Sequence, residues 1–170
     1  GSNAVPVAFN PNTGLVYTSA WHVPRIQQLD PQQEQVLGGR STGVNNRFPT
    51  VEPGDLLGHF VAINPLTGEK LWEIPLTDFP SSAGMLATGG RLLFTGKPTG
   101  EFLGLDETTG ETLWQFQTGS SINSTAITYT HNGRQYVTVA SGLGGGLANR
   151  YAAGKVPTGG SVWTFALMPK

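Results

Sequence analysis

A segment that occurs twice in this chain strongly limits the folds that it can adopt. Gly58–Ile74 aligns with Gly100–Phe116, which lies 42 residues later, and the two copies share the pattern G-x-F-x-A/G-x-N/D-x-x-T-G-E-x-L-W. A period of 42 residues falls in the ~40–45-residue range of four-stranded propeller blades. Helical repeats of similar length place apolar residues three and four positions apart, and these segments alternate instead. The repeat therefore predicts a β-propeller.

Each copy is predicted to form a β-hairpin that ends in tryptophan. Its first strand, at Phe60 or Phe102, has apolar residues on both faces, which is typical of a strand buried between layers. The turn that follows contains a glycine that can adopt positive φ. The return strand contains Trp72 in one copy and Trp114 in the other.

The remaining β-rich runs complete three blades. We expect eleven strands in groups of four, four and three, the third blade lacking its outermost strand. Outside the two hairpins, the expected strands are Pro6–Asn10, Leu15–Ala20, Ala83–Gly89, Arg91–Gly96, Ser124–Thr130, Arg134–Ala140 and Ser161–Leu167, with a turn at His131–Gly133. The sequence thus predicts an all-β fold, a partial propeller of about three four-stranded antiparallel blades.

Two segments interrupt the repeating pattern. Trp21–Leu57 is a polar insertion rich in Gln, Gly, Asn and Pro, and Gly142–Gly160 is a glycine-rich loop that begins with GLGGG. Loops of this length are binding surfaces, covers or disordered segments. The opening residues 1–4, GSNA, look like the remnant of an expression tag, so the propeller is assigned to residues 5–170.

Composition excludes several functions. With a formal net charge of −1, the chain has no positive field that would attract nucleic acid or anionic membranes. It has no cysteine, which excludes disulfides, thiolate catalysis and thiolate metal sites. GLGGG is followed by neither a helix nor a lysine at the spacing of a phosphate loop. Ser81 and Ser82 lie in a segment without a base, so a hydrolase triad has no support.

The repeated pattern resembles the tryptophan-docking motif of quinoprotein alcohol dehydrogenases, the methanol and ethanol dehydrogenase family that uses pyrroloquinoline quinone (PQQ). Three other segments are similar to that family: NPNTGLVYTSAWHVP, the long run from AGMLATGG to GLGGG, and SVWTFALMPK. The resemblance covers nearly everything from Pro6 onward and implies the C-terminal part of an eight-bladed propeller. By analogy, Trp72 and Trp114 would each pack against the turn of a neighbouring motif, burying ~150–250 Å².

The family resemblance also implies a chemistry and a location. Its members are periplasmic oxidoreductases that hold PQQ with Ca²⁺ or a lanthanide ion on the propeller axis and pass electrons from an alcohol to cytochrome c. In this chain Trp21, His22, Ser82 and Gly146 match positions near the cofactor. Members often have Asn at the position of Trp21, and Trp at those of Ser82 and Gly146.

No residue here matches the family's catalytic base, metal ligands or vicinal disulfide. We therefore expect no catalytic residue, no metal site and no bound cofactor in the isolated chain.

Other interpretations of the same residues stay open at this level. His22 can be a surface or packing residue, Ser82 a strand-entry residue, and GLGGG a flexible turn. A non-catalytic propeller with the same repeats, acting as a protein-binding scaffold, is the alternative function. Three blades cannot close a ring, so we expect the chain to pair with the rest of a parent propeller or, in isolation, to self-associate.

Overall fold

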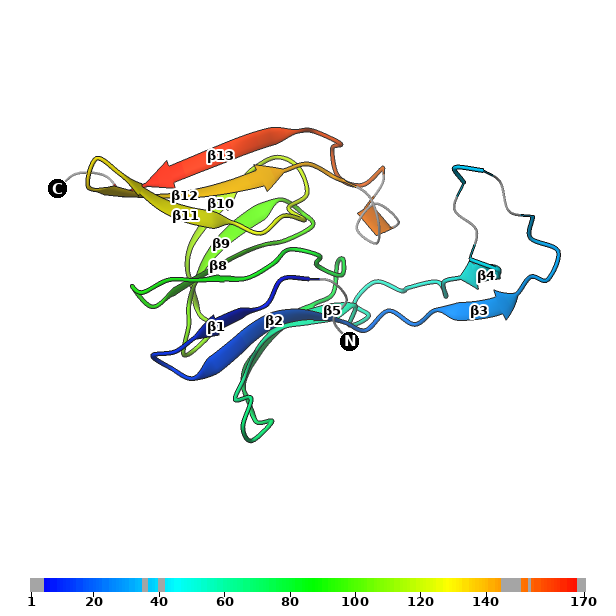
Figure 1. Ribbon diagram of the computed structural model, residues 1–170, viewed down its shortest axis with the longest axis horizontal. Helices are drawn as coiled ribbons and strands as arrows, with labels where there is room; N and C mark the ends of the chain where they lie inside the picture. The colour runs from blue at the N-terminus through cyan, green and yellow to red at the C-terminus, as the bar shows by residue number, and fades with distance from the viewer. Residues whose placement is uncertain (1–4, 35–36, 40–41, 145–150, 153, 168–170) are drawn as a thin grey trace.

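The computed structural model describes residues 5–34, 37–39, 42–144, 151–152 and 154–167, in which thirteen strands form four antiparallel sheets (Figure 1). The first sheet has the order β1-β2-β5-β6, formed by β1 (Ala8–Asn10), β2 (Leu15–Trp21), β5 (Gly58–Ile63) and β6 (Lys70–Leu76). The second has the order β10-β9-β8-β7, formed by β7 (Leu86–Ala87), β8 (Leu92–Gly96), β9 (Glu101–Asp106) and β10 (Thr112–Gln117). The third consists of β11 (Ile127–His131), β12 (Arg134–Ser141) and β13 (Ser161–Ala166), and the fourth of β3 (Ile26–Leu29) and β4 (Val44–Arg47).

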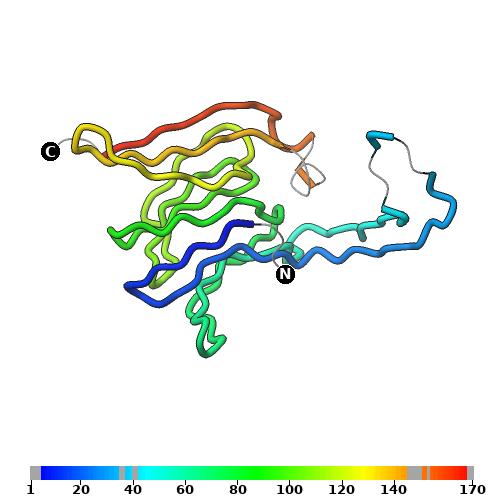
Figure 2. Tube along the Cα trace, viewed as in Figure 1, coloured from blue at the N-terminus to red at the C-terminus, as the bar shows by residue number. Residues whose placement is uncertain are grey.

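The first three sheets are the predicted blades of four, four and three strands, stacked face to face (Figure 2). In the third sheet β12 pairs with β11 on one side and β13 on the other, and β13 has no second neighbour within the described residues. The prediction of a partial propeller of about three blades is confirmed.

A separate hydrophobic core fills each junction between blades. Residues of the first and second sheets, with Met85 just before β7, form one cluster: Leu15, Tyr17, Phe60, Ala62, Trp72, Leu76, Met85, Leu93, Leu103 and Leu105. Residues of the second and third sheets, with the segments between strands, form another: Ala83, Phe102, Ile122, Ala126, Val137 and Val139. In β9 one face serves each cluster, as the apolar residues on both faces of this strand predicted.

The two motif tryptophans have different surroundings. Trp72 is 9% exposed, and its Nε1 donates a hydrogen bond to the main-chain oxygen of Glu107 at 2.9 Å. Glu107 begins the turn between β9 and β10, and Gly110 of that turn is so close to the Trp72 indole that a Cβ added to it would lie 2.8 Å from the ring. Trp114 is 40% exposed and contacts the rings of Phe102 and Phe165. Within the described residues the expected packing against a motif turn is therefore seen for Trp72 and not for Trp114.

The polar insertion contains a strand pair that its sequence did not predict. Strands β3 and β4 form an antiparallel ribbon, which extends away from the stacked blades (Figure 1). Side-chain amides support it, since Gln27 Nε2 donates to Asn46 Oδ1 at 3.2 Å. The ribbon does not lie against a core, so even its apolar residues Ile26 and Leu29 are 58% and 75% exposed, and no apolar periodicity marks it in the sequence.

Strands β7 and β11 differ most in extent from their predictions. Strand β7 is limited to Leu86–Ala87, because the amide of Met85 bonds to the carbonyl oxygen of Pro6 in the first blade at 3.1 Å. Strand β11 runs to His131, which pairs with Arg134. The turn is therefore the two-residue Asn132–Gly133, both with positive φ, as in a type I′ hairpin.

Candidate functional site

The predicted cofactor positions Trp21 and Ser82 lie at the same end of the blades. Trp21 is the last residue of β2, and Ser82 lies in the connection from β6 to β7. The indole Nε1 of Trp21 donates to the main-chain oxygen of Ser81 at 2.5 Å. The structure therefore joins two segments that are 60 residues apart in sequence.

A buried hydrogen-bond network holds the segment around Ser81 next to the end of β2. Ser81 is fully buried, and its hydroxyl donates to the carbonyl oxygen of Gly96 at 3.0 Å while accepting the amide of Ala83 at 3.1 Å. The hydroxyl of Ser19 lies 3.4 Å from the carbonyl oxygens of both Ser81 and Ala83. Because these buried polar groups are satisfied by one another, the half-buried Ser82 is held in a defined place.

Gly146 lies outside the described residues. The described start of its loop is bonded to the connection from β10 to β11, where the amide of Gly142 donates to the carbonyl oxygen of Ser121 at 2.7 Å. Asn123 Nδ2 donates to the carbonyl oxygen of Leu143 at 2.9 Å.

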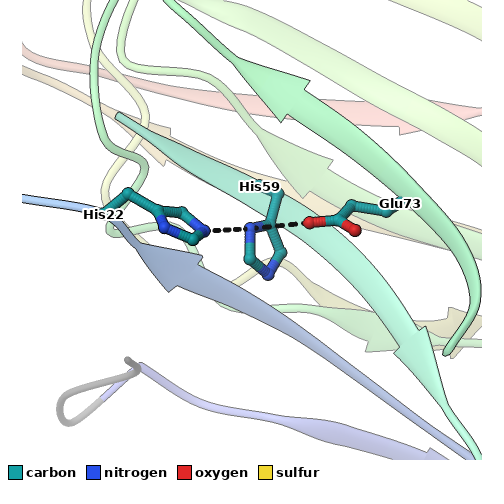
Figure 3. A group of neighbouring side chains, drawn as sticks. All are labelled: His22, His59 and Glu73. Atoms are coloured by element: carbon teal, nitrogen blue, oxygen red, sulfur yellow. Dashed lines mark hydrogen bonds and ion pairs between the residues drawn. The ribbon is translucent and has the colours of Figure 1, made fainter. Parts of the chain in front are cut away.

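His22 points to a different set of partners. It follows β2 directly, and its amide donates to the carbonyl oxygen of Leu57 at 2.9 Å, which extends the pairing of β2 with β5 by one residue. Its Nε2 lies 2.8 Å from Nδ1 of His59 on β5, and the same Nδ1 lies 3.0 Å from Oε1 of Glu73 on β6 (Figure 3). Three neighbouring strands of the first blade thus bring two imidazoles and a carboxylate together.

The environment of this trio favours a neutral imidazole beside an ionised carboxylate. Burial lowers the pKa of His59 below its usual value, with His22 and Lys70 acting in the same direction and Glu73 opposing them. A hydrogen bond from Lys70 Nζ to Oε2, at 2.5 Å, is the main reason why the pKa of Glu73 is lowered. Lys70 thus occupies one carboxylate oxygen and leaves the other directed at His59.

The sequence alone did not identify His59 and Glu73 as members of a site. His59 stands in an otherwise apolar strand, and Glu73 follows the motif tryptophan without a spacing that marks a site. The strand register would have revealed them, because Ala20 pairs with His59 and Val61 pairs with Glu73. All three side chains therefore lie on the face of the first blade opposite to Phe60 and Trp72.

Known proteins with similar sequences identify the family of the chain. The sequence pattern of the family described as "PQQ: Glucose/ethanol/alcohol dehydrogenase, beta-propeller domain" matches residues 1–137. The chain belongs to the PQQ alcohol dehydrogenase family. This result agrees with the resemblance carried by its two tryptophan motifs.

Individual members of the PQQ alcohol dehydrogenase family match over almost the whole chain. The quinoprotein alcohol dehydrogenase PedH of Pseudomonas putida KT2440 is 33% identical over 97% of the chain and 28% of its own length. The quinoprotein ethanol dehydrogenase of Pseudomonas putida is 36% identical over 98% of the chain and 27% of its own length. A europium-containing methanol dehydrogenase superimposes with a TM-score of 0.83 at 30% identity, over 98% of the chain and 33% of that protein.

The chain thus spans about a quarter to a third of the length of the family members that it matches, in their C-terminal portion.

The family's cofactor and metal fit the described residues to different degrees. The bond from the Trp21 indole to the main-chain oxygen of Ser81 brings Trp21 beside the segment that contains Ser82, and an indole next to polar groups suits the rim of a planar polar cofactor. Among the described residues, the one group of three or more His, Asp or Glu side chains close enough to share an ion is the His22–His59–Glu73 trio. Ca²⁺ and lanthanide ions prefer oxygen ligands, so a site with two imidazole nitrogens does not fit them.

Proposed function

We propose that the chain forms the C-terminal blades of a longer, periplasmic PQQ-dependent alcohol dehydrogenase. The match of residues 1–137 to the family pattern is the observation that carries this proposal. The scaffold alternative is not favoured, because the relatives described above, which match over nearly the whole chain, are dehydrogenases. A helix both long and apolar enough to span a bilayer does not occur in the described part of the chain.

In the whole enzyme, the quinone would supply the oxidising centre that takes two electrons from an alcohol. We assign this chain's share of the cofactor site to Trp21, His22, Ser82 and the undescribed Gly146. The hydrogen bond from Trp21 to Ser81 holds an indole beside Ser82, where members of the family place a tryptophan. Trp21 would therefore supply the aromatic surface that Ser82 lacks.

The catalytic base and the ligands for Ca²⁺ or a lanthanide ion would come from other blades of the parent. A relative from Methylorubrum extorquens is named as lanthanide-dependent, and one from Thauera butanivorans is named 1-butanol dehydrogenase (cytochrome c). These names support a metal-dependent parent that transfers electrons to cytochrome c.

The contact of Trp72 with the turn at Glu107–Gly110 supports a docking role for the repeated motif. We propose that each motif tryptophan fastens its blade to the next blade. Trp114 would then dock onto the turn of a further motif in the parent.

The coding sequence upstream of residue 5 and the activity of the extended protein test the proposed function. We expect an adjacent cysteine pair with the family's Glu, Asn and Asp, and alcohol-dependent dye reduction that requires added PQQ and metal. The isolated chain should show no such turnover, because it has no residue matching the base or metal ligands. Either turnover by the isolated chain or an extended protein that does not bind PQQ would contradict the proposal.

In isolation, the chain should self-associate through its third blade. Val162 is 72% exposed and Ile127 is 59% exposed on the outer face of that blade, and the outer edge of β13 is unpaired within the described residues. Apolar faces and bare strand edges favour association. Light scattering at micromolar concentration should report species larger than a monomer, and a monodisperse monomer would contradict this expectation.

A further inference from the structure

In the His22–His59–Glu73 trio, two potential hydrogen-bond partners face a single ring nitrogen. Nδ1 of His59 faces Nε2 of His22 at 2.8 Å and Oε1 of Glu73 at 3.0 Å (Figure 3). A ring nitrogen carries either one hydrogen or one lone pair. If Nδ1 donates to Glu73, it cannot accept from His22, and if it accepts from His22, its lone pair faces a carboxylate. One hydrogen on Nδ1 can therefore serve both contacts only if it is shared between two acceptors, which weakens each bond.

A cation would satisfy all three groups at once. The three ligand atoms lie within 4.8 Å of one another. Tetrahedral Zn²⁺ with bonds of ~2.1 Å separates its ligand atoms by ~3.4 Å. The observed separations of 2.8 and 3.0 Å lie below that value and the remaining pair lies within 4.8 Å, so the three side chains would rotate to equalise these distances around an ion.

The strands hold these ligands in place before any ion binds. His59 and Glu73 lie on the paired strands β5 and β6, and the amide of His22 is bonded to Leu57. Lys70 orients Glu73 by binding its second oxygen. Because sheet pairing already fixes the backbone positions of the ligands, ordering the site would cost little of the free energy of ion binding.

We propose that His22, His59 and Glu73 form a binding site for Zn²⁺ or a similar divalent transition-metal ion. Imidazole suits Zn²⁺, Cu²⁺ and Ni²⁺, whereas Ca²⁺ and Mg²⁺ prefer oxygen ligands. Three protein ligands leave a fourth tetrahedral position for water. The site is distinct from the family's cofactor metal in its donor set, and the proposal does not rest on the function proposed above.

Such an ion would link β2, β5 and β6 at the base of the ribbon. His22 follows β2 directly and precedes β3, so the ion would fix the start of the segment that leads to the ribbon. Binding to the folded state alone would also stabilise the blade.

Calorimetric titration of Zn²⁺ into the tag-free, chelator-treated chain tests the site. We expect one ion bound per chain, and a rise in Tm of about 5–10 °C at a Zn²⁺ concentration about 100-fold above Kd. His22→Ala and Glu73→Gln alter exposed side chains, so both variants should fold, and each should weaken Zn²⁺ binding by about 10–100-fold or more.

His131→Ala is the matched control, because His131 is the chain's third histidine and lies at the end of β11, outside the trio. It should bind Zn²⁺ as the unaltered chain does, and Ca²⁺ should give neither heat nor a change in Tm. Co²⁺ bound in place of Zn²⁺ should show the visible absorption of a four-coordinate site. Absence of Zn²⁺ binding, or equal binding by the His22→Ala, Glu73→Gln and His131→Ala variants, would overturn the proposal.

Discussion

The two copies of the repeated motif have the same sequence signature and opposite surroundings. In the first copy the tryptophan is buried and the turn is exposed, with Leu66 94% exposed. In the second copy the turn is packed and Trp114 is 40% exposed. Each copy of the motif can therefore take part in two contacts. Its tryptophan packs against the turn of one neighbouring copy, and its own turn receives the tryptophan of the other neighbour.

The chain's one described contact of this kind joins Trp72 to the second turn. Glu107 at the start of that turn is buried, and its carboxylate accepts a hydrogen bond from Asn10 Nδ2 in the first blade at 2.5 Å and lies 3.5 Å from Arg91 Nε. Pro65, which holds the matching position in the first copy, is exposed. A repeat thus gains its stability from the junction, and an isolated copy would have neither contact.

Replacing Trp72 should have the largest effect. Trp72→Ala would leave a cavity beside Tyr17, whose ring lies 6.1 Å from the indole, and should lower the free energy of unfolding by ~3–5 kcal/mol. Trp72→Phe keeps a ring but loses the bond to Glu107, and should cost less. Urea denaturation measures both, and an unchanged midpoint for Trp72→Ala would show that the junction does not stabilise the fold.

The turn glycines test the same junction from the other side. Both have positive φ, +76° for Gly68 and +75° for Gly110, so replacing either by alanine should lower the free energy of unfolding by ~1–2 kcal/mol through backbone strain alone. An added Cβ at Gly68 meets nothing within 4 Å, whereas at Gly110 it would lie 2.8 Å from Trp72. Gly110→Ala should therefore cost ~1–3 kcal/mol more than Gly68→Ala.

Trp72→Ala should remove most of that difference, because it removes the clash. Equal costs at the two glycines in the unaltered chain would contradict the asymmetry. The free energies of unfolding of Gly68→Ala and Gly110→Ala, each alone and combined with Trp72→Ala, decide between these outcomes.

Trp114→Ala should have a smaller effect than Trp72→Ala. Its indole is partly in water and packs edge-on against Phe102 and Phe165, so we expect a loss of ~1–2 kcal/mol. Iodide quenching should also reach Trp114 fluorescence more readily than that of Trp72. A cost as large as that of Trp72→Ala would mean that Trp114 is buried in solution, as self-association would bury it.

The smallest predicted effect concerns the first residue of each turn. Asp106 Oδ1 accepts bonds from the hydroxyl and amide of Thr108 at 2.6 and 2.8 Å and from the amide of Thr109 at 2.9 Å. These bonds lower the pKa of Asp106 to about 2. Because the unfolded value is higher, about 3.9, its contribution to stability is present above pH 4 and is lost as the pH falls toward 2.

Asn64 holds the same place in the first copy, and its Oδ1 accepts the amide of Leu66 at 2.9 Å without a titrating group. Asp106→Asn should therefore make stability less dependent on pH between 4 and 2. Asn64→Ala should leave that dependence unchanged. Urea midpoints at pH 2, 3, 4 and 6 measure both variants, and equal pH dependence in the unaltered chain and Asp106→Asn would contradict the prediction.

The blades were predictable from the sequence because their signals are local. Alternating apolar residues, turn glycines such as Gly68 and Gly110, and the repeat period together gave the sheets of four, four and three strands. The family also followed from these motifs, since the matched segments extend along nearly the whole chain. Boundaries such as that of β7 were less predictable, because Met85 pairs with Pro6 rather than with β8.

The sequence by itself determined the strand pattern, the turns and the family of this chain, because each depends on residues close together along it. Only the tertiary structure decided that Trp72 is buried while Trp114 is exposed, since the burial of each depends on which turn packs against it. It alone also brought His22, His59 and Glu73 together, across separations of 37 and 14 residues. Strand register sets such contacts, and a register is fixed by the pairing of whole strands rather than by any single residue.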